Sequence, residues 1–494
     1  MSDTRTLLQK IQAFRQRLDA LPRLVAEPVV VPVTTEAMAE VPVESRIAAG
    51  SRTQAVLEQS IRHLNKEEPA TPPSPVQLTA RARRVIAEAH ELVGSLRTLA
   101  DEPLLAGPPP GPRTEDTDPL AIWFRETAAM LGPAVRLTQS LPDSASEQLR
   151  LCEGLSGILE TVRQRLAVLG GALEERRRDA RQIDHLAHIL LTIDSDQPID
   201  ESAVVELATE IGAEGPNHPI RFVFAAPNEA QAYLGGTSYA APARFVACHS
   251  LTTARVMARM TRSSPEWRDD PLQPIIAALL HDIGMLRVPV DVLGTSNALL
   301  DEQRRLVEPH PRTGADLIAQ RLPAFAPIVA SIAAHHERLD GTGYPSGMKG
   351  DQVPPLARLL AVADLYCALC CRRPYRDARD PRSALTDTLL YAEQNILDRF
   401  AAEKLLPMSF YPIGSVVELS DGAVGVVAAN HVSRDDLHLA GRPVLNLLID
   451  SHGGVMPSPT PVNLAETDTG SVIRTLSHEE RARLLGRHYP QWAV

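Results

Sequence analysis

The chain has 494 residues and a formal net charge of −11 at pH 7; 44% of its residues are hydrophobic and only 4% are aromatic. The length predicts several domains with sizeable cores, and the acidic balance excludes a general affinity for nucleic acids or anionic membranes. The sequence has no uncharged apolar run of about 18 residues and no start of signal-peptide type. We therefore expect a cytoplasmic protein without a membrane span.

The first 142 residues are predicted to form short helices joined by linkers. Residues 27–44, 65–76 and 101–119 are rich in proline and acidic residues, and proline removes a backbone donor that regular structure needs. We expect this region to be a regulatory or dimerising part of the protein.

Residues 143–195 are predicted to form one long helix. Ser144 and Glu147 have the spacing of a capping box, and the apolar residues that follow alternate by four and three, at Leu155, Leu159, Val162, Leu166, Leu169 and Leu173. Such a seam fits either a coiled coil that forms a homodimer or a helix packed within its own subunit.

The second half of the chain divides into four predicted parts. Residues 196–240 are expected to form a small α/β connector with a strand at 219–226, and residues 241–405 a bundle of apolar helices. Residues 406–465 are expected to form a small β extension, because 414–430 predicts two strands around an Asp-Gly turn and 442–450 a third. Residues 466–494 are predicted to be a helical tail, so the fold class is mainly α.

Imidazole and carboxylate side chains recur on the apolar helical segments between residues 249 and 364. Each histidine taken alone is more often a core residue whose hydrogen bonds are satisfied than a ligand. Seven such side chains on four or five apolar segments instead favour a metal site, and these are His249, His281, Asp282, His310, His335, His336 and Asp364.

Asp364 gives the strongest physical argument for a cation. Its helical face carries Leu360, Ala361, Ala368 and Cys371 and has neither lysine nor arginine, and an unpaired buried carboxylate is costly or changes its protonation state. Seven nitrogen and oxygen ligands exceed what one tetrahedral zinc binds. They suit two octahedral divalent metals of the iron or manganese type, bridged by a carboxylate.

Five motifs then occur in order: HDIG at 281–284, the histidine of HP at 310, HHERLDGTGYP at 335–345, AVAD at 361–364 and RRPYR at 372–376. Together they resemble the HD-GYP subgroup of the HD-domain metal-dependent phosphohydrolases, over roughly residues 240–400. The resemblance implies a helical HD-domain bundle whose metal ligands are the seven residues above, with Asp282 as the bridging and catalytic carboxylate. It implies hydrolysis of cyclic di-GMP, a bacterial second messenger, to pGpG or GMP.

The resemblance also assigns roles to residues outside the ligand set. Arg373 and Arg376 match phosphate-contacting positions, for which a guanidinium is well suited, although solvated surface arginines are the alternative. Gly343, Tyr344 and Pro345 match the loop that borders the site in the family. That loop can contact partner proteins, including the diguanylate cyclases that make the messenger.

Two positions depart from the family pattern. Phe245 stands where members with three metals have a glutamate, so we expect two metals. Met285 replaces the lysine of HDxGK, and methionine cannot stabilise negative charge on a phosphate. An alternative function is therefore a catalytically silent domain that senses cyclic di-GMP or docks partner proteins. Lys349 and Arg287 are other cations nearby in the sequence, but their positions do not indicate that they reach the site.

Overall fold

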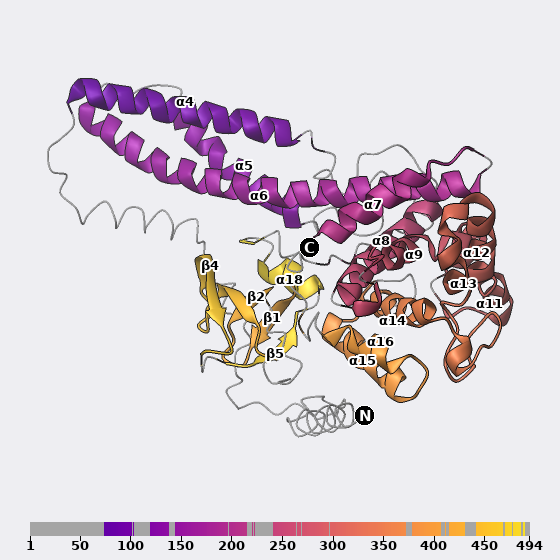
Figure 1. Cartoon of the computed structure of the whole chain (residues 1–494). Helices are drawn as coiled ribbons and strands as arrows, with labels where there is room; N and C mark the ends of the chain where they lie inside the picture. Colours follow the sequence, from indigo (N-terminus) through magenta and orange to yellow (C-terminus); the bar gives the residue numbers. More distant parts are fainter. Residues whose placement is uncertain are drawn as a thin grey trace, which may run out of the picture.

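The computed structural model describes residues 74–100, 102, 119–137, 144–195, 197–214, 220, 222, 241–262, 264–267, 269–295, 297–371, 378–406, 411, 414–429, 441–467, 470–476, 478–485, 488 and 489. Helices dominate this part of the chain, and one antiparallel sheet follows them (Figure 1). The predicted fold class is thus confirmed. The strand predicted at 219–226 lies outside the described residues except for positions 220 and 222.

Three helices form an elongated arm (Figure 1), in which α4 (Pro75–Ala100) and α5 (Pro119–Leu137) pack on the first half of α6 (Ala145–Asp194). The helix α6 has 50 residues and begins at the predicted cap. The Ser144 hydroxyl accepts a hydrogen bond from the Glu147 backbone N–H at 3.3 Å and donates one to the Glu147 carboxylate at 2.8 Å. These bonds satisfy a backbone donor that the helix start leaves free.

The apolar seam of α6 is covered by the chain's own helices. Leu155, Leu159 and Val162 are buried in one cluster with residues of α4 and α5, and Leu169 and Leu173 are buried against Leu120 and Trp123 of α5. Of the two alternatives for this seam, the structure therefore shows packing within the subunit. The second half of α6 joins a different core through Ile183, Leu186 and Leu190.

That larger core belongs to a helical domain. It is built from α7 (Glu201–Ala213), α8 (Ala241–Thr261), α9 (Gln273–Leu280), the 3-10 helix η3 (Ile283–Arg287), α10 (Val290–Leu293), α11 (Asp301–Val307), α12 (His310–Arg321), α13 (Ala326–Ala333), α14 (Pro355–Cys370), α15 (Pro381–Glu393) and α16 (Arg399–Glu403). None of the helices in the described ranges is long and apolar enough to cross a membrane.

The C-terminal sheet has five antiparallel strands in the order β4-β3-β2-β1-β5. They are β1 (Val416–Leu419), β2 (Val424–Ala429), β3 (Val444–Ile449), β4 (Val455–Asn463) and β5 (Val472–Thr475). The hairpin predicted around the Asp-Gly turn is present, and Gly422 has a positive φ of 86° there. The boundary predicted at residue 465 is wrong, because β5 follows it and only α18 (His478–Leu485) is helical in the described part of the tail.

The edge strand β4 is mostly exposed and has an unusual composition. Pro457, Pro459 and Pro461 occupy alternate positions of its nine residues. Proline has no backbone N–H and is tolerated in sheets mainly at such edges.

Candidate metal centre

All seven predicted ligands meet at one place in the helical domain. Their donor atoms form two groups, and within each group these atoms lie within 4.8 Å of one another. The first group is Asp282, His310, His335 and His336, and the second is His249, His281 and Asp364. Helix α8 carries His249 and α14 carries Asp364, while the other five lie where helices begin or end.

Gly284 controls how closely the His281–Asp282 segment approaches His310. His281 is the C-cap of α9, and Gly284 lies inside η3. A Cβ atom at position 284 would lie 2.1 Å from the His310 carbonyl oxygen and 2.9 Å from the Gly314 nitrogen. Only glycine therefore lets η3 pack directly on the start of α12.

Backbone carbonyls fix the orientation of three histidines. The Nδ1 atoms of His281, His310 and His335 lie 2.8, 2.8 and 2.7 Å from the carbonyl oxygens of Ala278, Val307 and Ile332, each three residues earlier. A carbonyl only accepts, so each Nδ1 carries a proton, and Nε2 is the nitrogen that each ring turns toward the centre. This is the arrangement that metal-binding histidines need.

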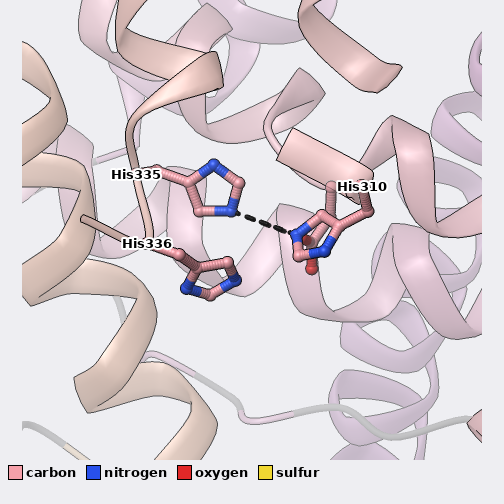
Figure 2. A group of neighbouring side chains, drawn as sticks. His310, His335 and His336 are labelled. Atoms are coloured by element: carbon pink, nitrogen blue, oxygen red, sulfur yellow. Dashed lines mark hydrogen bonds and ion pairs between the residues drawn. The ribbon is translucent and has the colours of Figure 1, made fainter. Parts of the chain in front are cut away.

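The inward-facing nitrogens fit bound cations and are unfavourable without them. The Nε2 atoms of His310 and His335 lie 3.3 Å apart (Figure 2), and the Nδ1 proton of each ring is already donated to a backbone carbonyl. The Nε2 atom of His281 is buried and has no hydrogen-bond partner among the described residues. Buried lone pairs of this kind are costly, and one cation in each group would satisfy them.

Asp282 lies between the two groups. Its Oδ1 is 3.2 Å from His310 Nε2 and 3.7 Å from His335 Nε2, while its Oδ2 is 3.5 Å from His281 Nε2 and 3.8 Å from His249 Nε2. One carboxylate oxygen thus faces each group, as a bridging ligand requires.

The charges of the site are set by burial and by this mutual contact. Burial alone would raise the pKa of Asp282, but His281, His310 and His335 outweigh it and hold the pKa well below its usual value. The pKa of Asp364 is likewise lowered against the effect of burial, mainly by its 2.8 Å contact with His249 Nε2. Burial lowers the pKa of His335 and His336. Anionic carboxylates and neutral imidazoles are the protonation states that bind divalent metals.

The predicted loop borders the first group. The ring centroid of Tyr344 lies 4.7 Å from that of His336 and 6.3 Å from that of His310, and burial raises the pKa of Tyr344. Pro345 follows through a cis peptide bond. Arg373 and Arg376, predicted to contact phosphates, lie outside the described residues.

The departures from the family pattern have clear places in the structure. Phe245 is buried, and Met285 packs partly buried against the same hydrophobic core. Arg287 binds Asp194 of α6 at 2.9 Å. The side chain of Lys349 lies against Gly341 of the loop, because a Cβ on Gly341 would be 2.3 Å from Lys349 Cε.

Glu337 was not predicted as a functional residue, and it is buried directly after His335 and His336. A carboxylate at the end of an apolar helix was the signal for it.

Comparison with known proteins agrees with this geometry. Residues 238–399 match the family model described as HD domain. The chain is 30% identical over 240 residues to a cyclic di-GMP phosphodiesterase from Pseudomonas aeruginosa, covering 48% of this chain and 54% of that protein. It is 40% identical over 123 residues to the cyclic di-GMP phosphodiesterase response regulator RpfG from Xanthomonas campestris, covering 25% and 32%.

A third relative is a 3'3'-cGAMP-specific phosphodiesterase from Vibrio cholerae, 40% identical over 109 residues and covering 22% of this chain and 24% of that protein. The chain thus spans about half or less of the length of these relatives. Residues 238–399 thus match an HD domain. The motifs of this segment and the relatives named cyclic di-GMP phosphodiesterases make it similar to the HD-GYP subgroup.

Proposed function

We propose that the protein is a metal-dependent phosphodiesterase that hydrolyses cyclic di-GMP to pGpG or GMP. The observation that supports this most is the position of Asp282, with one oxygen toward each of two groups of buried ligands. Relatives named as cyclic di-GMP phosphodiesterases support the same reaction class. In this proposal Asp282 is the central carboxylate, and Arg373 and Arg376 contact the substrate phosphates.

Two divalent cations, iron or manganese, are the proposed cofactors. The first would be held by His310, His335 and His336, the second by His249, His281 and Asp364, with Asp282 shared. When bound, such cations lower the pKa of coordinated water and stabilise negative charge on phosphate oxygens. The protein contributes imidazoles that the backbone already orients, so few groups need to reorganise when substrate binds.

A catalytically silent receptor for cyclic di-GMP is the second candidate function, and Met285 favours it. Its side chain packs on the hydrophobic core and brings no charge to the position where the family has lysine. The two functions differ in one measurement, since a receptor binds the dinucleotide without cleaving it.

The test combines metal analysis with hydrolysis by the full-length protein. We expect close to two iron or manganese ions per chain after anaerobic purification, and cleavage of cyclic di-GMP. No residue in the described part of the chain is identified as selecting guanine, so 3'3'-cGAMP is tested beside it. One zinc per chain, or no metal, would contradict the two-metal proposal. Binding of cyclic di-GMP without cleavage would support the receptor instead.

Asp364→Asn tests the ligand set directly. The carboxylate is 2.8 Å from His249 Nε2 and its pKa is held low, so the neutral amide should lose metal and lower the melting temperature of the metal-loaded protein. The matched control is Asp316→Asn, which changes an exposed carboxylate paired with Arg312 at 3.1 Å. Full metal content in Asp364→Asn would remove Asp364 from the ligand set.

A further inference from the structure

Glu337 holds the loop that follows the paired histidines. Its side chain is only 2% exposed although it directly follows His336. Its Oε1 accepts a hydrogen bond from the Ser346 backbone N–H at 2.7 Å, and its Oε2 accepts one from the Met348 N–H at 2.9 Å. Glu337 lies outside both groups of candidate ligands among the described residues. Both of its oxygens therefore accept hydrogen bonds from the loop.

The same loop packs on the backbone that carries the histidine ligands. The Tyr344 N–H donates to the His336 carbonyl at 3.3 Å. A Cβ on Gly343 would lie 2.4 Å from the Arg338 nitrogen and 2.5 Å from Glu337 Cα. No larger residue fits at position 343, so the loop and the ligand segment are in direct contact there.

Tyr344 sits between these two attachments. On one side Gly343 packs on the ligand segment, and on the other Ser346 is bound by Glu337. The Tyr344 ring then lies against His336 and His310, two of the rings drawn in Figure 2. If the Glu337 attachment were lost, the segment after Tyr344 would lose the two hydrogen bonds that Ser346 and Met348 donate to it.

We propose that Glu337 is a positioning residue that acts through Tyr344. Its carboxylate fixes residues 343–348 so that the Tyr344 ring covers the side of the centre formed by His310 and His336, the side at which the proposed substrate would bind. A carboxylate suits this task because both of its oxygens accept, and charge-assisted hydrogen bonds of this kind are strong. The effect on turnover rests on the proposed phosphodiesterase function, whereas the attachment of the loop can be measured without catalysis.

Glu337→Gln is the variant that tests the attachment. Glutamine has the same shape, but it accepts with one oxygen only and turns an NH₂ group toward the second N–H. We expect amide hydrogen exchange at Ser346 and Met348 to become at least about tenfold faster, since their opening would lose its main restraint. Exchange in α13 and α14 and the metal content should stay unchanged. The control is Asp351→Asn, which alters an exposed carboxylate paired with Arg358 at 3.1 Å.

Steady-state kinetics test whether Glu337 acts through Tyr344. We expect Glu337→Gln to lower kcat/KM about tenfold, since small displacements at an active site are costly. Tyr344→Ala should lower it at least as much. The double variant should match Tyr344→Ala within about twofold, because the second change removes the group that the first one misplaces.

The outcomes separate this inference from the proposed function. Unchanged exchange at Ser346 and Met348 in Glu337→Gln, or a double variant whose loss equals the product of the two single losses, would overturn the inference. A wild-type protein that cleaves no cyclic dinucleotide would overturn the proposed function instead. In that case faster exchange confined to the loop would still support the positioning role, and unchanged exchange would still refute it.

Discussion

Three histidines of the centre have the same local design. Each lies at the end or the start of a helix, and its Nδ1–H donates to the carbonyl three residues earlier. This hydrogen bond fixes the orientation of the ring. Helix ends leave such carbonyls and turns available, so a histidine placed there gains a partner for Nδ1 without a dedicated side chain. The orientations of the candidate ligands His281, His310 and His335 therefore follow from where the helices stop and start.

Met285→Lys tests the residue that directly follows the HDIG motif and departs from the family pattern. Losing one preorganised donor typically lowers turnover about a hundred- to a thousandfold, so we expect a slow enzyme that binds cyclic di-GMP normally. Lysine has a similar length, and its aliphatic stem can pack where Met285 now contacts the core. Single-turnover hydrolysis with iron or manganese loaded should therefore be faster in Met285→Lys.

Two results would contradict that expectation. Cleavage by neither protein, with binding by both, would favour the silent receptor. A fast wild-type enzyme that Met285→Lys slows would show that another group fills the role of the family lysine. Arg287 and Arg312 would be the first to test, although Arg287 already binds Asp194.

Among the elements, α6 connects the arm to the helix that carries His249. Arg255 of α8 is 1% exposed, and its Nη2 donates to Asp179 at 2.8 Å and to Gln182 at 2.6 Å, both on α6. Arg244 of α8 pairs with Asp184 of α6 at 3.3 Å. Buried ionic contacts are poor sources of net stability, but they allow few alternative arrangements of the two partners. The contacts of Arg255 and Arg244 therefore fix the position of α6 along α8.

Asp179→Ala tests whether the buried ionic contacts hold α6 on α8. It leaves the Arg255 guanidinium buried without its closest carboxylate, and breaking a buried pair in this way typically costs about 3 kcal/mol or more. The measurement is urea unfolding, with Asp316→Ala of the exposed Arg312 pair as the control, for which a change below about 0.5 kcal/mol is expected. Equal effects of the two substitutions would show that α6 is not held through Asp179.

Leu159→Ala tests how the seam of α6 is used. Leu159 is fully buried against α4 and α5, so the truncation should lower the free energy of unfolding by about 3 kcal/mol and leave the sedimentation coefficient unchanged. Glu160→Ala, on the exposed side of the same turn, should change neither. If Leu159→Ala instead converted a dimer to a monomer, the coiled-coil alternative would be correct.

For the whole molecule, motifs and periodicity were enough to predict the helical domain, the long helix and the residues that gather around Asp282. The seam of α6 predicted burial but not its partner, because a heptad pattern does not say whether α4 and α5 or a second chain covers it. The four-residue strand β5 was missed, since Val472–Thr475 is too short for a clear alternation. The roles of Gly284 and Glu337 depend on contacts with distant backbone atoms, which spacing alone does not reveal.

The proline-rich strand β4 has a consequence for how molecules of this protein meet in solution. A neighbouring chain that added a strand to this border of the sheet would need a continuous ladder of donors and acceptors. Pro457, Pro459 and Pro461 supply no donors, and the opposite border, β5, has only four residues. Growth of the sheet by cross-chain pairing, the first step of many aggregation processes, is therefore disfavoured at both borders.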